Sequence, residues 1–210
     1  TIIAGEGDDV VSFATNPTEG DRVDLAGGED TLILAEGDNA VTVSNIETII
    51  AGGGDDGVRL ATHLAAGDRV DLGDGVDSLD LAAGVNTAAV LNVEAITGTT
   101  GNDTLTLENT QAGTEIDLAS GEDTLTLAQG DNAVTVSNIE TIIAGAGNDA
   151  VSLATNLAEG DRVDLGAGDD SLSLADGDNV TTVSNIEEII GGAGNDAVAL
   201  ATTAVSGDLV

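Results

Sequence analysis

The sequence lacks several residue types, and each absence excludes a class of structure or partner. Its 210 residues include no Cys, Met, Trp or Tyr, and only one Phe, one Pro and one His. Without Cys, neither disulfides nor thiolate metal sites can hold the fold. No apolar run approaches the roughly 18 residues of a transmembrane helix, so we expect no membrane insertion.

Basic residues are almost as scarce. Four Arg oppose 39 acidic residues, which gives a formal net charge of −35 and excludes nucleic acid and anionic membrane surfaces as partners. No Cys or Lys offers a nucleophile, and the lone His63 has no repeated Ser or acid partner at a defined spacing. We therefore predict that this segment is not an enzyme and that His63 is a surface residue.

Acidic composition with few aromatic residues is typical of disordered chains. Here, however, 41% of the residues are hydrophobic and the mean hydropathy is positive, which argues against disorder. A chain that is both this acidic and this apolar can become compact only if cations neutralise its carboxylates.

A nonapeptide recurs along the whole chain. Residues 191–199 read G-G-x-G-x-D-x-U-x, where U is a large apolar residue, and this is the pattern of calcium-binding parallel β-solenoids. Eight degraded copies precede it, and the sixth residue is Asp in all nine. These sixth-position aspartates are Asp9, Asp30, Asp56, Asp77, Asp103, Asp123, Asp149, Asp170 and Asp196.

The nonapeptides belong to a longer repeat. The chain divides into copies 1–47, 48–94, 95–140 and 141–187 and a partial copy 188–210, each full copy holding two nonapeptides. Successive motif aspartates lie 20–26 residues apart, which predicts coils of alternating length that average about 23 residues. The array begins and ends inside a copy without polar caps, so we expect it to be an excerpt from a longer array.

Apolar residues at motif positions eight and ten alternate with small or polar residues, as in a half-buried strand. The pairs are Val11/Phe13, Leu32/Leu34, Val58/Leu60, Leu79/Leu81, Leu105/Leu107, Leu125/Leu127, Val151/Leu153, Leu172/Leu174 and Val198/Leu200. The sequence therefore predicts an all-β parallel β-solenoid of about nine coils, with no helix. One alignment is irregular, because Ile3, Ile50 and Ile143 fall opposite aspartates such as Asp24. Either that position differs between coil types or the alignment slips there.

The residue types of the motif suit calcium. Glycine lets the backbone turn with positive φ and exposes its carbonyls, and Ca²⁺ takes 6–8 hard oxygen ligands. Aspartates of stacked coils would lie about 4.8 Å apart and repel by roughly 3.5 kcal/mol at an effective dielectric constant near 20. A divalent ion between turns converts this repulsion into ligation, so we expect calcium binding and folding to be coupled.

On these residues the chain resembles the RTX (repeats-in-toxin, haemolysin-type) calcium-binding β-rolls. The resemblance implies several Ca²⁺ ions, bound by the nine aspartates and by carbonyls from the first half of each nonapeptide. It also implies folding outside the cell after type I secretion. Position one is mostly Ala or Leu here, and the motifs are not contiguous. We therefore expect one edge of the solenoid to bind calcium and the opposite edge to use other turns.

Those other turns are also acidic, as in Glu36-Gly37-Asp38-Asn39 and Asp176-Gly177-Asp178-Asn179. Gly, Asp and Asn favour turns for their own reasons, so solvated turns are the favoured interpretation. A second row of calcium sites remains the alternative.

Two functions fit the repeat. The favoured one is a calcium-rigidified rod in a large secreted or cell-surface bacterial protein, such as an adhesin stalk, surface layer or extracellular filament. The alternative is a calcium-dependent folding module of a type I-secreted enzyme or toxin whose catalytic domain lies outside this segment. Calcium ions, neighbouring copies of the chain and cell-surface glycans are the candidate partners. Ice binding is set aside because motif position three carries no regular array of Thr or Asn.

Overall fold

The computed structural model describes residues 1–201, so the last part of the partial copy 188–210 lies outside the described residues. Every regular element among them is a β-strand, and no helix there is long and apolar enough to cross a membrane. The chain forms two compact units, residues 1–105 and 106–210. Each unit is a parallel β-solenoid of about five coils, which confirms the predicted fold class.

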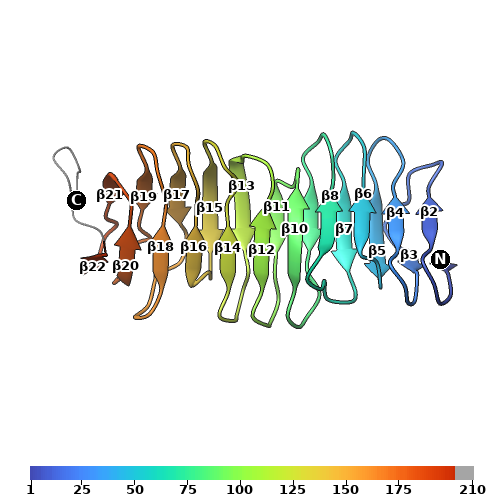
Figure 1. The fold of residues 1–210 in the computed structure, drawn as a ribbon, viewed down its shortest axis with the longest axis horizontal. Helices are drawn as coiled ribbons and strands as arrows, with labels where there is room; N and C mark the ends of the chain where they lie inside the picture. Colours follow the sequence, from blue (N-terminus) through green and yellow to red (C-terminus); the bar gives the residue numbers. More distant parts are fainter. Residues whose placement is uncertain (202–210) are drawn as a thin grey trace. The chain divides into compact units, whose positions relative to one another are not determined.

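In the first unit the strands alternate between two parallel sheets (Figure 1). One sheet holds the odd strands β1 (Ile2–Ile3), β3 (Asp21–Asp24), β5 (Ala40–Ser44), β7 (Gly57–Leu60), β9 (Ser78–Asp80) and β11 (Ala95–Thr97). The other holds the even strands β2 (Val10–Ser12), β4 (Thr31–Ile33), β6 (Thr48–Ile50), β8 (Asp68–Asp71) and β10 (Thr87–Leu91). The division between the units falls within β12 (Thr104–Leu107).

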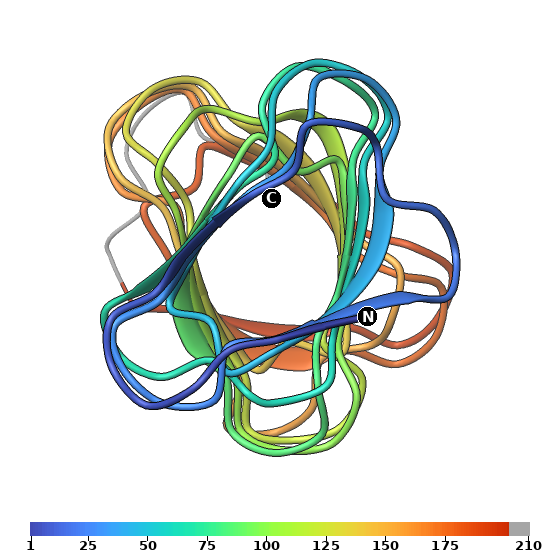
Figure 2. The same cartoon turned by 90° about the vertical axis from the view of Figure 1, so that its right-hand side faces the viewer.

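The second unit repeats this arrangement. Its odd strands are β13 (Ala112–Asp117), β15 (Ala133–Ser137), β17 (Ala150–Leu153), β19 (Ser171–Ser173) and β21 (Glu188–Ile190). Its even strands are β14 (Thr124–Thr126), β16 (Thr141–Ile143), β18 (Arg162–Asp164), β20 (Val180–Ser184) and β22 (Ala197–Leu200). Within each unit the coils follow one another around one axis, with the turns projecting outwards (Figure 2).

The coils are shorter than was predicted from the spacing of the aspartates. Strand register advances by 21 residues from Ile2 to Val23, by 20 from Asp21 to Val41 and by 17 from Ala40 to Gly57. A 47-residue copy contains five strands, and a coil contains two, so one copy makes two and a half coils. Equivalent strands of successive copies therefore lie in opposite sheets, as β3 and β8 do.

The core follows the predicted alternation. Both residues are buried in every predicted apolar pair from Leu32/Leu34 to Leu172/Leu174. Val11/Phe13 and Val198/Leu200, in the outermost described coils, are partly exposed. The irregular alignment is real, since Ile3 pairs with Asp24 and Ile50 with Asp71 on the outer faces of the sheets. That position thus differs between coil types.

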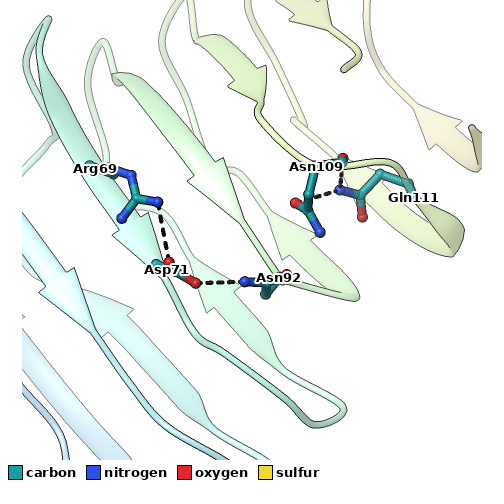
Figure 3. Close-up of polar contacts among 5 residues, drawn as sticks. All are labelled: Arg69, Asp71, Asn92, Asn109 and Gln111. Carbon is teal, nitrogen blue, oxygen red and sulfur yellow. Dashed lines mark hydrogen bonds and ion pairs between the residues drawn. The ribbon is translucent and has the colours of Figure 1, made fainter. Parts of the chain in front are cut away.

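The 17-residue coils are short because they turn one corner with a three-residue loop such as Asn45-Ile46-Glu47, between β5 and β6. The corner asparagines adopt left-handed φ values of 51–56°, a conformation that Asn tolerates better than most residues. In Figure 3 the Asn92 amide donates to Asp71 Oδ1 over 2.7 Å, and Arg69 donates to Asp71 Oδ2 over 3.2 Å. The Asn92–Asp71 hydrogen bond thereby links the corner to the preceding coil.

Copy 95–140 is one residue shorter than the others. Side-chain hydrogen bonds hold its loop before β13. Gln111 Nε2 donates to the carbonyl and side-chain oxygens of Asn109 at 2.7 and 3.1 Å (Figure 3). Its Oε1 accepts the Thr114 hydroxyl at 2.7 Å. In the sister loops an aspartate such as Asp68 instead accepts the backbone N–H three residues earlier, that of Ala65.

Candidate metal site in the glycine–aspartate turns

The nine predicted aspartates lie on both edges of the solenoid, so the expectation of a single calcium edge was wrong. The turns that enter even strands carry Asp9, Asp30, Asp103, Asp123 and Asp196. The turns that enter odd strands carry Asp56, Asp77, Asp149 and Asp170. The half-coil offset between copies explains the change of edge, because it moves each pair of nonapeptides to the side opposite the previous pair.

On each edge the aspartates form part of a polar row with a fixed order, which we call the Asn–Asp–Asp–Glu row. Two rows are complete within a unit. They consist of Asn39, Asp56, Asp77 and Glu94, and of Asn132, Asp149, Asp170 and Glu187. Each member occupies the position directly before a strand, one coil after the previous member.

Backbone N–H groups connect successive members of a row. The N–H of Asn39 donates to Asp56 Oδ1 at 2.8 Å, and that of Asp56 donates to Asp77 Oδ1 at 2.7 Å. The N–H of Asp77 then donates to Glu94 Oε2 at 2.8 Å. The second row repeats this pattern at 3.0, 2.7 and 2.8 Å. One oxygen of each carboxylate is thus used by a neighbouring coil.

The second oxygen of the buried aspartates has no partner. Seven of the nine motif aspartates are at most 1% exposed, and in five of these seven the Oδ2 atom makes no hydrogen bond. These five are Asp30, Asp56, Asp77, Asp149 and Asp170. Asp9 is partly exposed and Asp196 is exposed. Buried polar atoms are nearly always satisfied, so this recurring exception needs an explanation, such as a bound ion, a proton or an ordered water.

Burial also perturbs ionisation. Desolvation raises the pKa of Asp77 to about 6; the N–H of Asp56 lowers it in part, and the negative charges of Asp56 and Glu94 raise it further. Desolvation likewise raises the pKa of Asp170 to about 6. Burial raises the pKa of Asp56 as well, against the hydrogen bonds from Asn39. Each ionised carboxylate therefore needs a compensating charge.

The glycines of these turns pack closely against the carbonyls of the preceding turn. A Cβ at Gly73 would overlap the Gly52 carbonyl oxygen, and one at Gly75 would overlap that of Gly54 and lie 2.9 Å from Asp77 Oδ1. Gly166 and Gly168 stand in the same relation to the carbonyls of the preceding turn. The absence of side chains at these glycines thus lets successive turns stack closely beside the aspartates.

The candidate metal-ligand atoms are hard oxygens, which suit Ca²⁺ better than softer metals. The described residues contain no group of three or more Asp, Glu, His or Cys side chains arranged to hold a metal. A site between two turns therefore has at most two carboxylates, and backbone carbonyls must supply further ligands. For Asp56 the candidate ligands are its Oδ2, Asp77 Oδ1 and the carbonyls of Gly52 and Gly54, which lie four and two residues before it in the sequence.

Sequence analysis missed two members of the row. Glu47, Glu94, Glu140 and Glu187 each accept the N–H of the preceding aspartate at 2.7–2.8 Å. Three of the four stand in the phrase Ser-Asn-Ile-Glu, which Leu91-Asn92-Val93-Glu94 replaces in the second copy, and this recurrence was the available signal. Asn39, Asn86, Asn132 and Asn179 are at most 3% exposed, although their turns were predicted to be solvated.

The acidic side chains of those same turns do face solvent. Asp38 is exposed, and its Oδ1 accepts the Asp55 N–H at 3.0 Å. Asp131 and Asp178 accept the N–H groups of Asn148 and Asn195 in the same way, both at 2.8 Å. The solvated-turn interpretation thus describes the acidic residues and fails for the asparagines.

The remaining polar residues lie as expected. His63 is exposed, and Arg69 and Arg162 pair with Asp71 and Asp164 on the surface. Comparisons with known protein families, with curated proteins and with solved structures give no match for this chain. Function must therefore be argued from the turns themselves.

Proposed function

We propose that the chain is a calcium-binding structural repeat, similar to the RTX β-rolls, in which Ca²⁺ ions bridge successive coils. The observation that carries the proposal is the set of five buried aspartates with unpartnered Oδ2 atoms, Asp30, Asp56, Asp77, Asp149 and Asp170. An isolated buried carboxylate is too costly to persist uncompensated. A bound divalent ion would neutralise it and join the two coils.

The ligands would be the motif aspartates, the backbone carbonyls four and two residues before them, and the carboxylate of the next coil. Asp9 and Asp196 occupy equivalent positions and belong to the same set. Ca²⁺ accepts irregular oxygen ligation, whereas Mg²⁺ requires octahedral geometry and keeps its waters. The site is therefore expected to prefer calcium.

A rod is the favoured role for such an array. Each described coil contacts its neighbours through main-chain ladders, and the core contains Val, Leu and Ile side chains in register. These features suit a spacer in a large secreted or cell-surface bacterial protein, for which millimolar extracellular calcium would supply the ions. Neighbouring copies and cell-surface glycans are its candidate partners.

The same buried carboxylates favour the second candidate, a module of a type I-secreted enzyme or toxin that folds only outside the cell. Such a module would remain unfolded where calcium is scarce, because the buried charges then oppose folding. The activity would belong to a domain outside this segment.

Circular dichroism with calcium tests the shared basis of both roles. After chelation the chain should lack β signal, and it should fold cooperatively near millimolar Ca²⁺ but not with Mg²⁺. Asp77→Ala should raise the calcium midpoint. Asp80→Ala, which removes an exposed carboxylate from the following strand, should leave it unchanged. A chain that folds equally well in chelator and binds no calcium would overturn the proposal.

A further inference from the structure

Four buried asparagines stand where the row would otherwise continue with aspartate. Asn39, Asn86, Asn132 and Asn179 precede the aspartates of their rows by one coil. In three of them Oδ1 accepts a backbone N–H from the coil before, at 3.1 Å from Leu64, Gln111 and Leu157. The aspartates use Oδ1 in the same way, so Nδ2 of Asn corresponds in position to Oδ2 of Asp.

The amide nitrogen donates to three oxygens at that position. Asn132 Nδ2 lies 2.9 Å from Ala128 O, 2.8 Å from Gly130 O and 2.7 Å from Asp149 Oδ1. Asn39, Asn86 and Asn179 make the same three contacts, all between 2.6 and 3.1 Å. Each amide thus meets carbonyls four and two residues earlier and the next coil's carboxylate.

At an aspartate the atom equivalent to Nδ2 is Oδ2, which can only accept hydrogen bonds when the carboxylate is ionised. Asp149 Oδ2 is buried without a partner, and the corresponding carbonyls belong to Gly145 and Gly147. Asp170 Oδ1 corresponds to Asp149 Oδ1, the carboxylate oxygen that accepts the hydrogen bond from the Asn132 amide. At the aspartate turn the Gly145 carbonyl accepts the Ala167 N–H at 2.8 Å and Asp170 Oδ1 accepts the Asp149 N–H at 2.7 Å, but no donor reaches Asp149 Oδ2, where an asparagine would supply an NH₂ group.

We infer that the asparagine coils take no metal, because the amide Nδ2 of Asn39, Asn86, Asn132 and Asn179 occupies the place that a cation fills at the aspartate coils. This inference rests on the proposed calcium function. Each complete Asn–Asp–Asp–Glu row then binds two ions, one between the two aspartates and one between the second aspartate and the glutamate. The asparagine closes the row without metal, so the ions form separate pairs.

Exchanging the two residue types in one row tests the inference. In Asn132→Asp the new carboxylate faces Ala128 O, Gly130 O and Asp149 Oδ1 without a donor. This variant should bind one more Ca²⁺ per chain than the parent and lose stability in chelator. Asp149→Asn should bind one fewer Ca²⁺ and gain stability in chelator, because the amide supplies the missing donor.

Asn148→Asp is the matched control. It lies in the same turn as Asp149, is exposed and has an aspartate, Asp55, as its equivalent in the second copy. Its calcium stoichiometry should equal that of the parent chain. The stoichiometry is measured by isothermal titration with Ca²⁺ and the stability by urea titration in chelator, both on the full 210-residue chain.

The outcomes separate the two proposals. If the parent binds calcium but Asn132→Asp adds no ion and Asp149→Asn removes none, the inference is wrong and the calcium function stands. If Asn132→Asp does not fold, the stoichiometry of Asp149→Asn decides alone. If the parent binds no calcium, the proposed function fails, and the inference fails with it.

Discussion

Acidification should stabilise the metal-free chain, the reverse of ordinary acid denaturation. The folded-state pKa of Asp77 and Asp170 is about 6, against 3.8 for an unperturbed carboxyl, chiefly because both groups are buried. Each folded carboxyl therefore holds its proton more tightly than the unfolded one. The resulting stabilisation is fully present below pH 3.8 and is lost as the pH rises through about 6.

The size of the effect follows from the shift. A difference of about 2 pKa units corresponds to about 3 kcal/mol for each group, which is a large fraction of a typical stability of about 5–15 kcal/mol. The physical reason is local. A protonated Oδ2 becomes a donor and can bond to a glycine carbonyl, as the asparagine amide does in its own turn.

The assay follows the far-UV β signal in metal-free buffers from pH 7.5 down to about pH 4, with urea titration where the chain is folded. Protonation of exposed carboxylates also removes repulsion and so favours folding at low pH. The slope of the unfolding free energy against pH must therefore be compared between variants of equal charge. Asp77→Asn/Asp170→Asn should flatten the dependence on pH, whereas Glu19→Gln/Glu159→Gln, at exposed positions, should flatten it much less. Equal slopes for the two double variants would refute the argument.

Two further substitutions test the turns. Gly73→Ala places a Cβ against the Gly52 carbonyl at a φ of +86°, whereas Gly67→Ala has a φ of +109° but open space around it. Gly67→Ala should cost about 1–2 kcal/mol of unfolding free energy and Gly73→Ala more; equal losses would contradict the overlap. Pro17 occupies the place of Leu64 without an N–H, and Asn39 Oδ1 is left unpartnered. Pro17→Leu should raise stability in urea titration by up to about 1 kcal/mol. A decrease of about 0.4–1 kcal/mol, the entropic effect of losing proline, would show that no hydrogen bond forms.

The fold could be predicted because its signals are local. Alternating apolar residues and glycine turns define each strand and its inner face, and they need no knowledge of how coils stack. The length of a coil was mispredicted because the distance from Asp30 to Asp56 was taken for one turn. These two residues lie on opposite edges, and the coil step from Asp30 leads to Glu47 over 17 residues.

The members of the row other than aspartate were missed for a related reason. Asn39 and Glu47 differ in type from Asp30, so a search for an invariant residue passes over them. Their shared place becomes visible only when the register of the strands is known. The alignment of Ile3 with Asp24 and the unequal spacing of the motif aspartates were the clues in the sequence that neighbouring coils are not equivalent.

The two-and-a-half-coil copy has a consequence for how such an array can change in length. Adding or deleting one copy would turn everything that follows by half a coil, so a feature on the outer face of one sheet would move to the other. Arg22 on β3 and Arg69 on β8, which occupy the same place in successive copies, already lie in opposite sheets. Only changes by an even number of copies keep every later surface facing the same way. The natural unit of insertion or recombination is therefore a pair of copies.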